Sequence, residues 1–175
     1  MRTVTFGAAC SLDLYIARQD GSVDWLQWSD EVASISGELW KTLDTVVMGR
    51  KTYEAGARMG TTSYPGVKNY VFSRTLEKSP DENVQIVRDD ASEFVAGLKR
   101  EPGQGICVMG GGELARSLFE ADLIDEVGLN IHPVLLGSGI PFFHSMSRQM
   151  ELELRENRTL KNGCAYLLYR IQRKA

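Results

Sequence analysis

One arrangement occurs twice in the chain and strongly restricts the fold: a short apolar run that ends at glycine and is followed at once by a helical pattern. The first copy is Thr45–Met48, whose closing glycine precedes the helical residues Arg50–Ala55. The second is Ile106–Met109, which runs through Gly110–Gly112 into a helix over Glu113–Ala121. Apolar runs this short are typical of buried strands. Each copy therefore predicts a strand that feeds a helix N-terminus, the basic connection of an α/β sheet.

Strand and helix signals alternate along the rest of the chain, which predicts a single α/β domain over residues 1–175 with a largely parallel sheet. Ser29 is the expected N-cap of the first long helix, because apolar residues follow it at helical spacing. These are Val32, Ile35, Leu39, Trp40 and Leu43. The other predicted elements are strands over Thr3–Ala9, Tyr70–Phe72, Val84–Val87 and Glu126–Ile131, and a helix over Ala91–Arg100.

The C-terminal part has a different pattern. Met150, Leu152 and Leu154 alternate with charged residues, Asn162–Gly163 is a tight-turn signal, and Ala165–Ile171 is a second long strand. Alternation of this kind is typical of an antiparallel strand with one wet face. We therefore expect a hairpin to complete the sheet.

Composition restricts the partners that the protein can have. The 175 residues are 43% hydrophobic and 25% charged, as in soluble globular proteins. A net charge of −3 without a lysine and arginine cluster argues against nucleic-acid binding, which needs a basic face. No run approaches the roughly 20 apolar residues that cross a bilayer, and Met1–Ala9 lacks the pattern of a signal peptide. We expect a cytoplasmic protein that binds a small molecule, and neither nucleic acid nor membrane.

Three cysteines, Cys10, Cys107 and Cys164, lie far apart in apolar, strand-like runs. An odd number without metal-ligand spacing indicates neither a disulfide framework nor a zinc site. We expect three buried thiols and no metal.

The glycine turns are also the first indication of function. A helix N-terminus exposes unpaired N–H groups, and glycine lets a phosphate approach the backbone closely. Either turn alone is more simply explained as a tight connection, but two together suit one diphosphate. Ser73 and Arg74 end a further strand, at the edge where open α/β sheets bind ligands. Arg74 can fork onto a ribose 2′-phosphate, although alone it is also consistent with an ordinary exposed arginine.

In combination, the motifs resemble the dihydrofolate reductase-like superfamily, specifically small stand-alone proteins similar to the C-terminal reductase domain of the bacterial riboflavin biosynthesis protein RibD. The segments are Ser11–Ala17, Met48–Glu54, Phe72–Arg74, Gly110–Leu114 and Pro133–Phe143, in the family's order. The resemblance runs from the first predicted strand to the last. It implies a three-layer α/β/α fold with a mostly parallel central sheet and a C-terminal antiparallel hairpin.

The resemblance also implies an NADPH site. By analogy, Arg50, Lys51 and Thr52 contact the diphosphate or nearby ribose, and Ser73 and Arg74 hold the adenosine 2′-phosphate. The full implied set is Gly49, Arg50, Lys51, Thr52, Ser73, Arg74, Gly110, Gly111, Gly112, Glu113 and Leu114. The family further implies a cis peptide bond between Gly110 and Gly111, which costs about 2.5–4 kcal/mol for a non-proline residue and usually marks a functional site.

Two acids are candidate catalytic residues. Asp13 follows the first strand, and the resemblance places the matching aspartate of the riboflavin-pathway relatives in the active site. A turn or capping role explains Asp13 equally well. Asp30, with Glu31, begins the first long helix, where dihydrofolate reductases carry a pterin-binding acid and where the helix dipole favours carboxylates in any case.

The third catalytic candidate is Tyr53, which follows the first glycine turn. Together with Trp25 and Trp28 it suits either a flat substrate pocket or the anchoring of the core. The sequence around His132 and His144 does not suggest a catalytic triad, so both are expected to be structural.

These features predict an NADPH-dependent reductase of a planar heterocycle or of a small carbonyl or imine compound. The leading specific substrate is 5-amino-6-(5-phosphoribosylamino)uracil, although Leu14 and Tyr15 stand where those relatives usually have glycine and often lysine. A flavin or a folate also suits the same pocket. The alternatives are a catalytically silent nucleotide-binding or regulatory dimer with this fold, and a structural domain without a ligand. For the reductase we expect a homodimer, because small relatives of this kind pair through their sheets.

Overall fold

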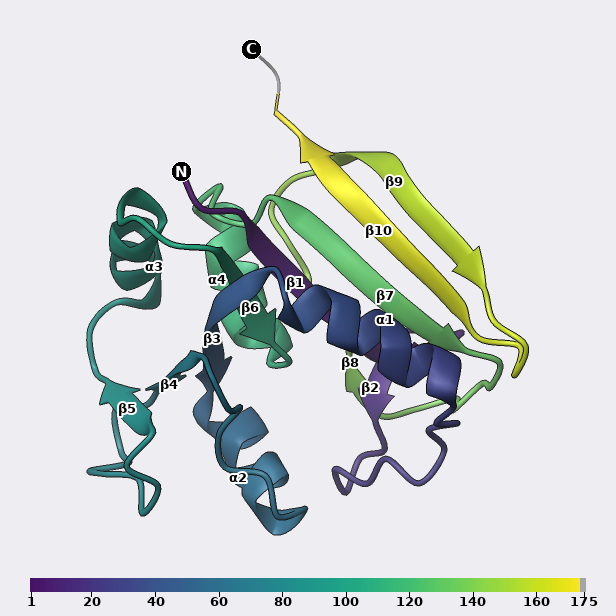
Figure 1. Cartoon of the computed structure of the whole chain (residues 1–175), viewed down its shortest axis with the longest axis horizontal. Helices are drawn as coiled ribbons and strands as arrows, with labels where there is room; N and C mark the ends of the chain where they lie inside the picture. The colour runs from purple at the N-terminus through teal and green to yellow at the C-terminus, as the bar shows by residue number, and fades with distance from the viewer. Residues whose placement is uncertain (174–175) are drawn as a thin grey trace.

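A computed structural model describes residues 1–173 of the chain. Its centre is an eight-stranded sheet in the order β5-β4-β3-β6-β1-β7-β10-β9 (Figure 1). Neighbours from β5 to β7 are parallel, and β10 is antiparallel to both β7 and β9. The strands are β1 (Val4–Ser11), β3 (Leu43–Gly49), β4 (Lys68–Phe72), β5 (Val84–Val87), β6 (Gly105–Met109), β7 (Glu126–His132), β9 (Glu151–Thr159) and β10 (Ala165–Gln172). The predicted mostly parallel α/β sheet with a C-terminal antiparallel hairpin is therefore confirmed.

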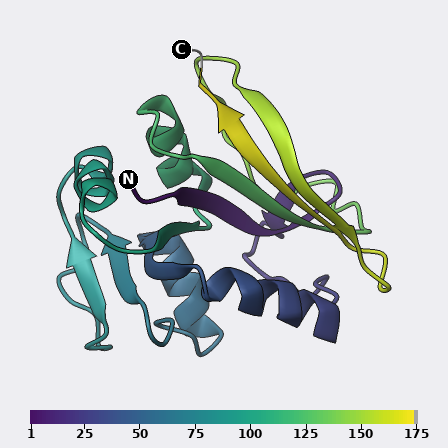
Figure 2. The same cartoon turned by 45° about the horizontal axis from the view of Figure 1, so that its top comes forward.

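Helices cover both faces of the sheet. Figure 2 shows α3 (Ala91–Arg100) and α4 (Gly112–Glu120) on one side and α1 (Asp30–Trp40) and α2 (Arg50–Arg58) on the other. Side chains of a strand alternate between the two faces. In β3, Val47 joins the core under α3 and α4, whereas Val46 and Met48 join the core beside α2.

The β9–β10 hairpin is the least enclosed part of the sheet. Leu152 and Leu154 of β9 are 44% and 47% exposed. The hairpin turn nevertheless packs on the start of α1, where Leu160 and Cys164 form a small buried cluster with Val32. Figure 1 shows the hairpin at one edge of the sheet, with the turn between β9 and β10 next to the start of α1.

Several boundaries differ from the predictions. Leu43, expected on the face of α1, instead begins β3, because the helix ends at Trp40. A two-stranded sheet of β2 (Tyr15–Ala17) and β8 (Ile140–Pro141) was not predicted. These strands are three and two residues long, too short to give a periodic signal, and they pair only through tertiary contact.

The three cysteines are buried and free, as expected. Burial raises the pKa of the Cys10 and Cys107 thiols to about 12, so both stay protonated near neutral pH. Among residues 1–173 there is no helix of the length and apolarity that a membrane span requires. The same residues contain no group of three or more metal-ligating side chains in a suitable arrangement.

Candidate functional site

The two glycine turns meet at the carboxyl ends of β3 and β6. The strands pair in continuous parallel register from Thr45 to Met48, so their closing turns leave the sheet side by side. Thr52, in the first turn of α2, contacts the second motif directly: a Cβ built on Gly110 would lie 3.1 Å from the Thr52 hydroxyl oxygen. A Cβ on Gly111 would lie 3.9 Å from the Gly49 nitrogen. The structure therefore brings Gly49–Thr52 and Gly110–Gly112 into one place.

The chain reverses direction at the second motif through left-handed glycines. The φ angles of Gly110 and Gly111 are 54° and 71°, values at which a side chain is disfavoured. The expected cis peptide bond is wrong: the Gly110–Gly111 bond is trans, like every peptide bond in the described chain. Two consecutive positive φ angles instead carry the chain from β6 into α4.

Neither helix that starts at these turns has a side-chain cap. The N-cap residues are Gly49 for α2 and Gly111 for α4, and in the described part of the chain no side chain accepts a hydrogen bond at either cap. The first N–H groups of a helix have no intrahelical acceptor. Two helix N-termini, each with partial positive charge, thus lie close together, and their first backbone N–H groups have no side-chain acceptor.

The ends of β4 and β5 extend this edge of the sheet. Ser73 is buried, and its hydroxyl oxygen accepts hydrogen bonds from the backbone N–H groups of Thr75 (3.2 Å) and Leu76 (2.9 Å). Ser73 therefore builds a turn that presents the exposed Arg74. Arg88, which follows β5, contacts the same turn by donating to the Leu76 carbonyl at 3.4 Å. Arg88 was not among the predicted site residues, although its position directly after a predicted strand was the available signal.

Among the other cofactor candidates, Arg50 forms an ion pair with Glu54 one helical turn along α2, at 2.8 Å. Lys51 and Glu113 are exposed, and Leu114 is partly buried against the core. A Cβ on Gly112 would lie 2.2 Å from the His144 ring, so a side chain at this position would require the ring to move. His144 thus packs against the start of α4.

Asp13 joins two loops at the carboxyl end of β1. The Ser11 hydroxyl donates to one carboxylate oxygen at 2.6 Å, and the backbone N–H groups of Leu136 and Gly137 donate at 3.1 and 2.7 Å. The Ser11 hydrogen bond, followed by the two backbone donors, lowers the pKa of Asp13. The carboxylate is therefore ionised at neutral pH and holds the loop after β7 in place.

Leu14, one of the two departures from the family pattern, has an unusual backbone conformation. Its φ is 62°, in the left-handed region where glycine is favoured. The Leu14 carbonyl accepts from Phe142 N–H at 2.8 Å, so the conformation is fixed by the β8 segment. A glycine, which the resemblance implies at this position, would fit this backbone without strain, whereas here a leucine side chain packs against the core.

The two remaining catalytic candidates lie apart from one another. Tyr53 is 5% exposed in the α2 core, and its hydroxyl is 2.7 Å from that of Ser79. Asp30 is exposed in the first turn of α1. The neighbouring Glu31 accepts from Lys161 N–H at 2.8 Å, which places this helix start against the hairpin turn.

His132 is a structural histidine, as expected, at the end of β7. Its Nδ1 accepts from Gln27 N–H at 3.0 Å and lies 3.4 Å from the Cys164 sulfur. Trp25 packs edge-on against its ring, with centroids 5.5 Å apart. Desolvation lowers the pKa of His132. Trp28, in contrast, is exposed.

The sequence of the chain is similar to one protein family and to two bacterial proteins. The family model of the RibD C-terminal domain matches residues 2–166. YwjB of Bacillus subtilis (strain 168) is 39% identical over 150 residues, which are 84% of this chain and 86% of YwjB. YyaP of the same organism is 29% identical over 180 residues, covering 96% of this chain and 94% of YyaP. Neither relative has an assigned function.

Two solved structures share the fold. A protein of Shewanella sp. PV-4, provisionally described as a riboflavin biosynthesis protein, superposes with a TM-score of 0.84 at 26% identity over 99% of this chain and 100% of its own. The Thermotoga maritima diaminohydroxyphosphoribosylaminopyrimidine deaminase/5-amino-6-(5-phosphoribosylamino)uracil reductase superposes with a TM-score of 0.74. Its identity is 16%, over 98% of this chain and 57% of that one, and this likeness shows the fold alone. With the family model spanning nearly the whole chain and this dihydrofolate reductase-like architecture, the protein belongs to the RibD C-terminal domain family.

Proposed function

We propose that the protein is an NADPH-dependent reductase whose cofactor lies across the carboxyl edge of β4, β3 and β6. The observation that carries this proposal is the meeting of two uncapped helix N-termini at Gly49 and Gly111. A diphosphate carries acceptor oxygens and negative charge, which match the free N–H groups and the positive helix ends. The glycines leave the backbone accessible to it.

The adjoining turn supplies a matching place for the 2′-phosphate. Arg74 is exposed beside the Ser73 turn and, among the described residues, makes no ion pair with a carboxylate. A guanidinium in this position can fork onto a phosphomonoester. This arrangement favours NADPH over NADH, which lacks that phosphate.

When bound, NADPH supplies a hydride to the substrate. The chain's contribution is to orient both partners and exclude water. Asp13 is suited to positioning, because three donors hold its carboxylate in the ionised state. We therefore propose that it fixes the loop after β7, and that the proton required by the reduced product comes from another source.

The substrate that we propose is a planar heterocycle, with 5-amino-6-(5-phosphoribosylamino)uracil as the first compound to test. The Thermotoga maritima neighbour carries this reductase activity in its name. Leu14 and Tyr15 change the mouth of the site relative to the family pattern, so related pyrimidines and pteridines belong in the same screen.

Titration of the purified protein with NADPH and with NADH, followed by nicotinamide fluorescence, tests the cofactor. We expect micromolar NADPH affinity and a preference over NADH that collapses in Arg74→Ala. Hydrogen exchange should show NADPH protecting the first turns of α2 and α4 but not that of α1. Absence of saturable binding by either cofactor would refute the reductase proposal.

A second candidate, a catalytically silent nucleotide-binding dimer, is favoured by the engaged state of Asp13, which leaves no proton donor assigned. Saturable NADPH binding without NADPH oxidation across the substrate screen would support it. We also propose a homodimer, supported by the exposed Leu152 and Leu154 of the edge strand β9. Light scattering of the native chain and of Leu152→Glu, which should be monomeric, tests the dimer.

A further inference from the structure

Asn130 and His132 form a polar pair on β7. Their side chains lie on the same face of the sheet, because the two residues are two positions apart along a strand. The alternate residues Val127 and Leu129 belong to the core under α3 and α4. Asn130 and His132 therefore lie on the opposite face, on the side of α1.

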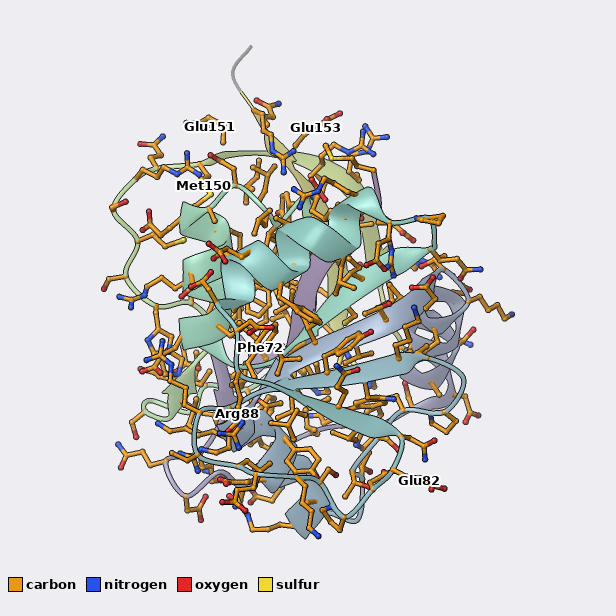
Figure 3. The ribbon with its side chains drawn as sticks, turned by 90° about the vertical axis from the view of Figure 1, so that its left-hand side faces the viewer. Phe72, Glu82, Arg88, Met150, Glu151 and Glu153 are labelled. Atoms are coloured by element: carbon orange, nitrogen blue, oxygen red, sulfur yellow. The ribbon has the colours of Figure 1, made fainter. Side chains whose placement is uncertain are left out.

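The pair lies towards the edge at which the parallel strands end. Figure 3 shows that edge on two other strands, where Phe72 of β4 and Arg88 after β5 lie near each other and away from Glu82, which precedes β5. Because β7 is parallel to β1, and β1 to β6, the carboxyl end of β7 lies at the same edge. Ser11, the last residue of β1, is the register partner of His132. Open α/β sheets bind ligands at this edge.

The contacts of His132 fix the position of its ring proton. Its Nδ1 accepts from the Gln27 N–H at 3.0 Å, and the Cys164 sulfur lies 3.4 Å from the same nitrogen. Burial raises the pKa of the Cys164 thiol and lowers that of His132, so the thiol keeps its proton and the ring is uncharged near neutral pH. An uncharged imidazole whose Nδ1 accepts carries its proton on Nε2.

This proton determines which end of the Asn130 amide faces the histidine. The amide lies 3.4 Å from Nε2 of His132. An NH2 group in this position would set two donors against each other, so the amide oxygen occupies it, since hydrogen bonding distinguishes the two ends of an amide. The other end is buried and has no hydrogen-bond partner within residues 1–173. That end is therefore the NH2 group of Asn130.

Trp25 carries a second unpaired donor beside the same histidine. Its ring packs on His132, and its indole N–H is buried without an acceptor in the described part of the chain. An unpaired buried donor costs about 1–3 kcal/mol. On this face of the sheet, a cavity of about 410 Å³ extends to Tyr166, the register partner of Asn130. Two unpaired donors around one histidine, on a face with open space, indicate a ligand that offers acceptors.

From this arrangement we infer that Asn130 is a specificity-determining residue, whose NH2 group donates to a ring carbonyl of the substrate heterocycle while His132 holds the amide in place. This inference rests on the proposed function. A carbonyl oxygen only accepts hydrogen bonds, whereas an exocyclic amino group presents hydrogens that oppose those of Asn130. The site therefore selects oxo-pyrimidines over their amino analogues. The unpaired groups are covered in the free protein, so binding includes a local side-chain movement.

Calorimetry with a matched pair of ligands tests the role of Asn130. The probes are 5,6-diaminouracil and tetraaminopyrimidine, which carry two oxo groups or two further amino groups on the same ring. Each is titrated, with NADP⁺ present, into the native chain, Asn130→Leu and Asn130→Asp. We expect the native chain to prefer diaminouracil and Asn130→Leu to bind it about tenfold more weakly, as for loss of one buried hydrogen bond. Asn130→Asp, which replaces the donor by an acceptor, should favour the amino analogue. The control for the added charge is Asn157→Asp, at an exposed residue of β9, which should match the native chain.

NADPH titrations of the same variants separate this inference from the proposed function. Asn130 lies outside the proposed cofactor residues, so NADPH affinity should change by less than about twofold, which also shows that each variant is folded. Equal weakening of both probes by Asn130→Leu, or a native preference for tetraaminopyrimidine, would overturn the inference. Binding of neither probe to a native chain that binds NADPH would do the same, and in all three cases the proposed cofactor site stands. If the native chain binds neither NADPH nor NADH, the proposed function itself fails, and the inference fails with it.

Discussion

The four helices in the described part of the chain begin in two different ways. The helices α1 and α3 are capped by the side chains of Ser29 and Asp90, which accept hydrogen bonds from the first turn. The helices α2 and α4 begin at Gly49 and Gly111, which have no side chain to offer. A capping side chain is worth about 1 kcal/mol relative to alanine but only a few tenths of a kcal/mol relative to glycine, so α2 and α4 forgo the smaller amount.

The difference separates helices whose first N–H groups are capped by a side chain from helices whose first N–H groups, under the proposed function, bind the cofactor. The start of α1 is also fastened from outside, through Glu31 to the hairpin turn and through Gln27 to His132. The starts of α2 and α4 instead lie against each other, with Thr52 packed on Gly110. Substitutions at these four positions and their neighbours can break or sharpen the contrast.

The largest effect is expected at the first residue of α4. Gly112→Ala places a Cβ 2.2 Å from the His144 ring and 3.2 Å from the Phe142 carbonyl oxygen. Overpacking of this kind should lower the free energy of unfolding by about 3 kcal/mol, measured by urea denaturation. The control is Gly97→Ala inside α3, where a Cβ meets nothing within 4 Å. That change should stabilise the protein by about 0.5–1 kcal/mol. Destabilisation of both variants alike would contradict the assignment of Gly112 to a crowded helix start.

The fastening of α1 predicts a pH dependence. His132 is buried and neutral, and desolvation lowers its pKa below the unfolded value of about 6.5. As the pH falls, the unfolded chain therefore binds a proton at this histidine before the native chain does. The free energy of unfolding should consequently fall as the pH drops below about 6.5. His132→Gln should cost about 2 kcal/mol through lost buried hydrogen bonding and should flatten this part of the profile. Urea denaturation between pH 5 and 8 measures both effects. An unchanged slope in His132→Gln would assign the effect to other groups.

Removing a cap should have a smaller, purely structural effect. In Asp90→Ala the N–H groups of Ser92 and Glu93 lose their acceptor. The free energy of unfolding should fall by about 1 kcal/mol, in thermal or urea denaturation. Because this helix start is complete without a ligand, the stabilisation gained from NADPH should be the same as for the native chain. A lost NADPH response would place Asp90 in the cofactor site and blur the contrast.

Adding a cap should have the smallest effect on stability and an opposite effect on binding. Gly49 has φ −82° and ψ 160°, a normal N-cap conformation, and a Cβ there meets nothing within 4 Å. Gly49→Ser should stabilise the free protein by about 0.3 kcal/mol. It should weaken NADPH binding about threefold, because the new hydroxyl occupies donors that the diphosphate needs. Unfolding and fluorescence titrations are the two measurements, and tighter NADPH binding would argue against a diphosphate at this turn.

Much of the fold was predictable because its signals are local. Ser29 caps α1 as the sequence predicts, and the strand and helix on either side of Gly49 lie where the apolar run and helical pattern place them. Asn162–Gly163 forms the hairpin turn between β9 and β10. The two-stranded sheet of β2 and β8 was missed because its pairing joins Tyr15 to Pro141, and no local pattern reports such a contact.

The candidate site divides in the same way. The adjacency of the two glycine turns follows from neighbouring parallel strands and was anticipated. The partners of Asp13 were not, because two of them are backbone N–H groups more than 120 residues away in the loop after β7. Tyr53 reads as a site residue from its position after a motif, yet helix geometry turns it into the core. Arg88 was missed because a single arginine after a strand is not informative by itself, and its contact with the turn after β4 depends on the pairing of β4 with β5.

The position of β1 in the sheet has a consequence for how the protein comes to be folded. This strand, near the start of the chain, lies between β6 and β7, and its first pairs join Val4 to Ile106 and Thr5 to Glu126. Its hydrogen bonds close only after more than 100 further residues have been synthesised, and contacts of such long sequence separation fold slowly. Until then, β1 is an apolar segment without its pairing strands on the nascent chain. A fragment that ends before β6 lacks both of the strands that pair with β1.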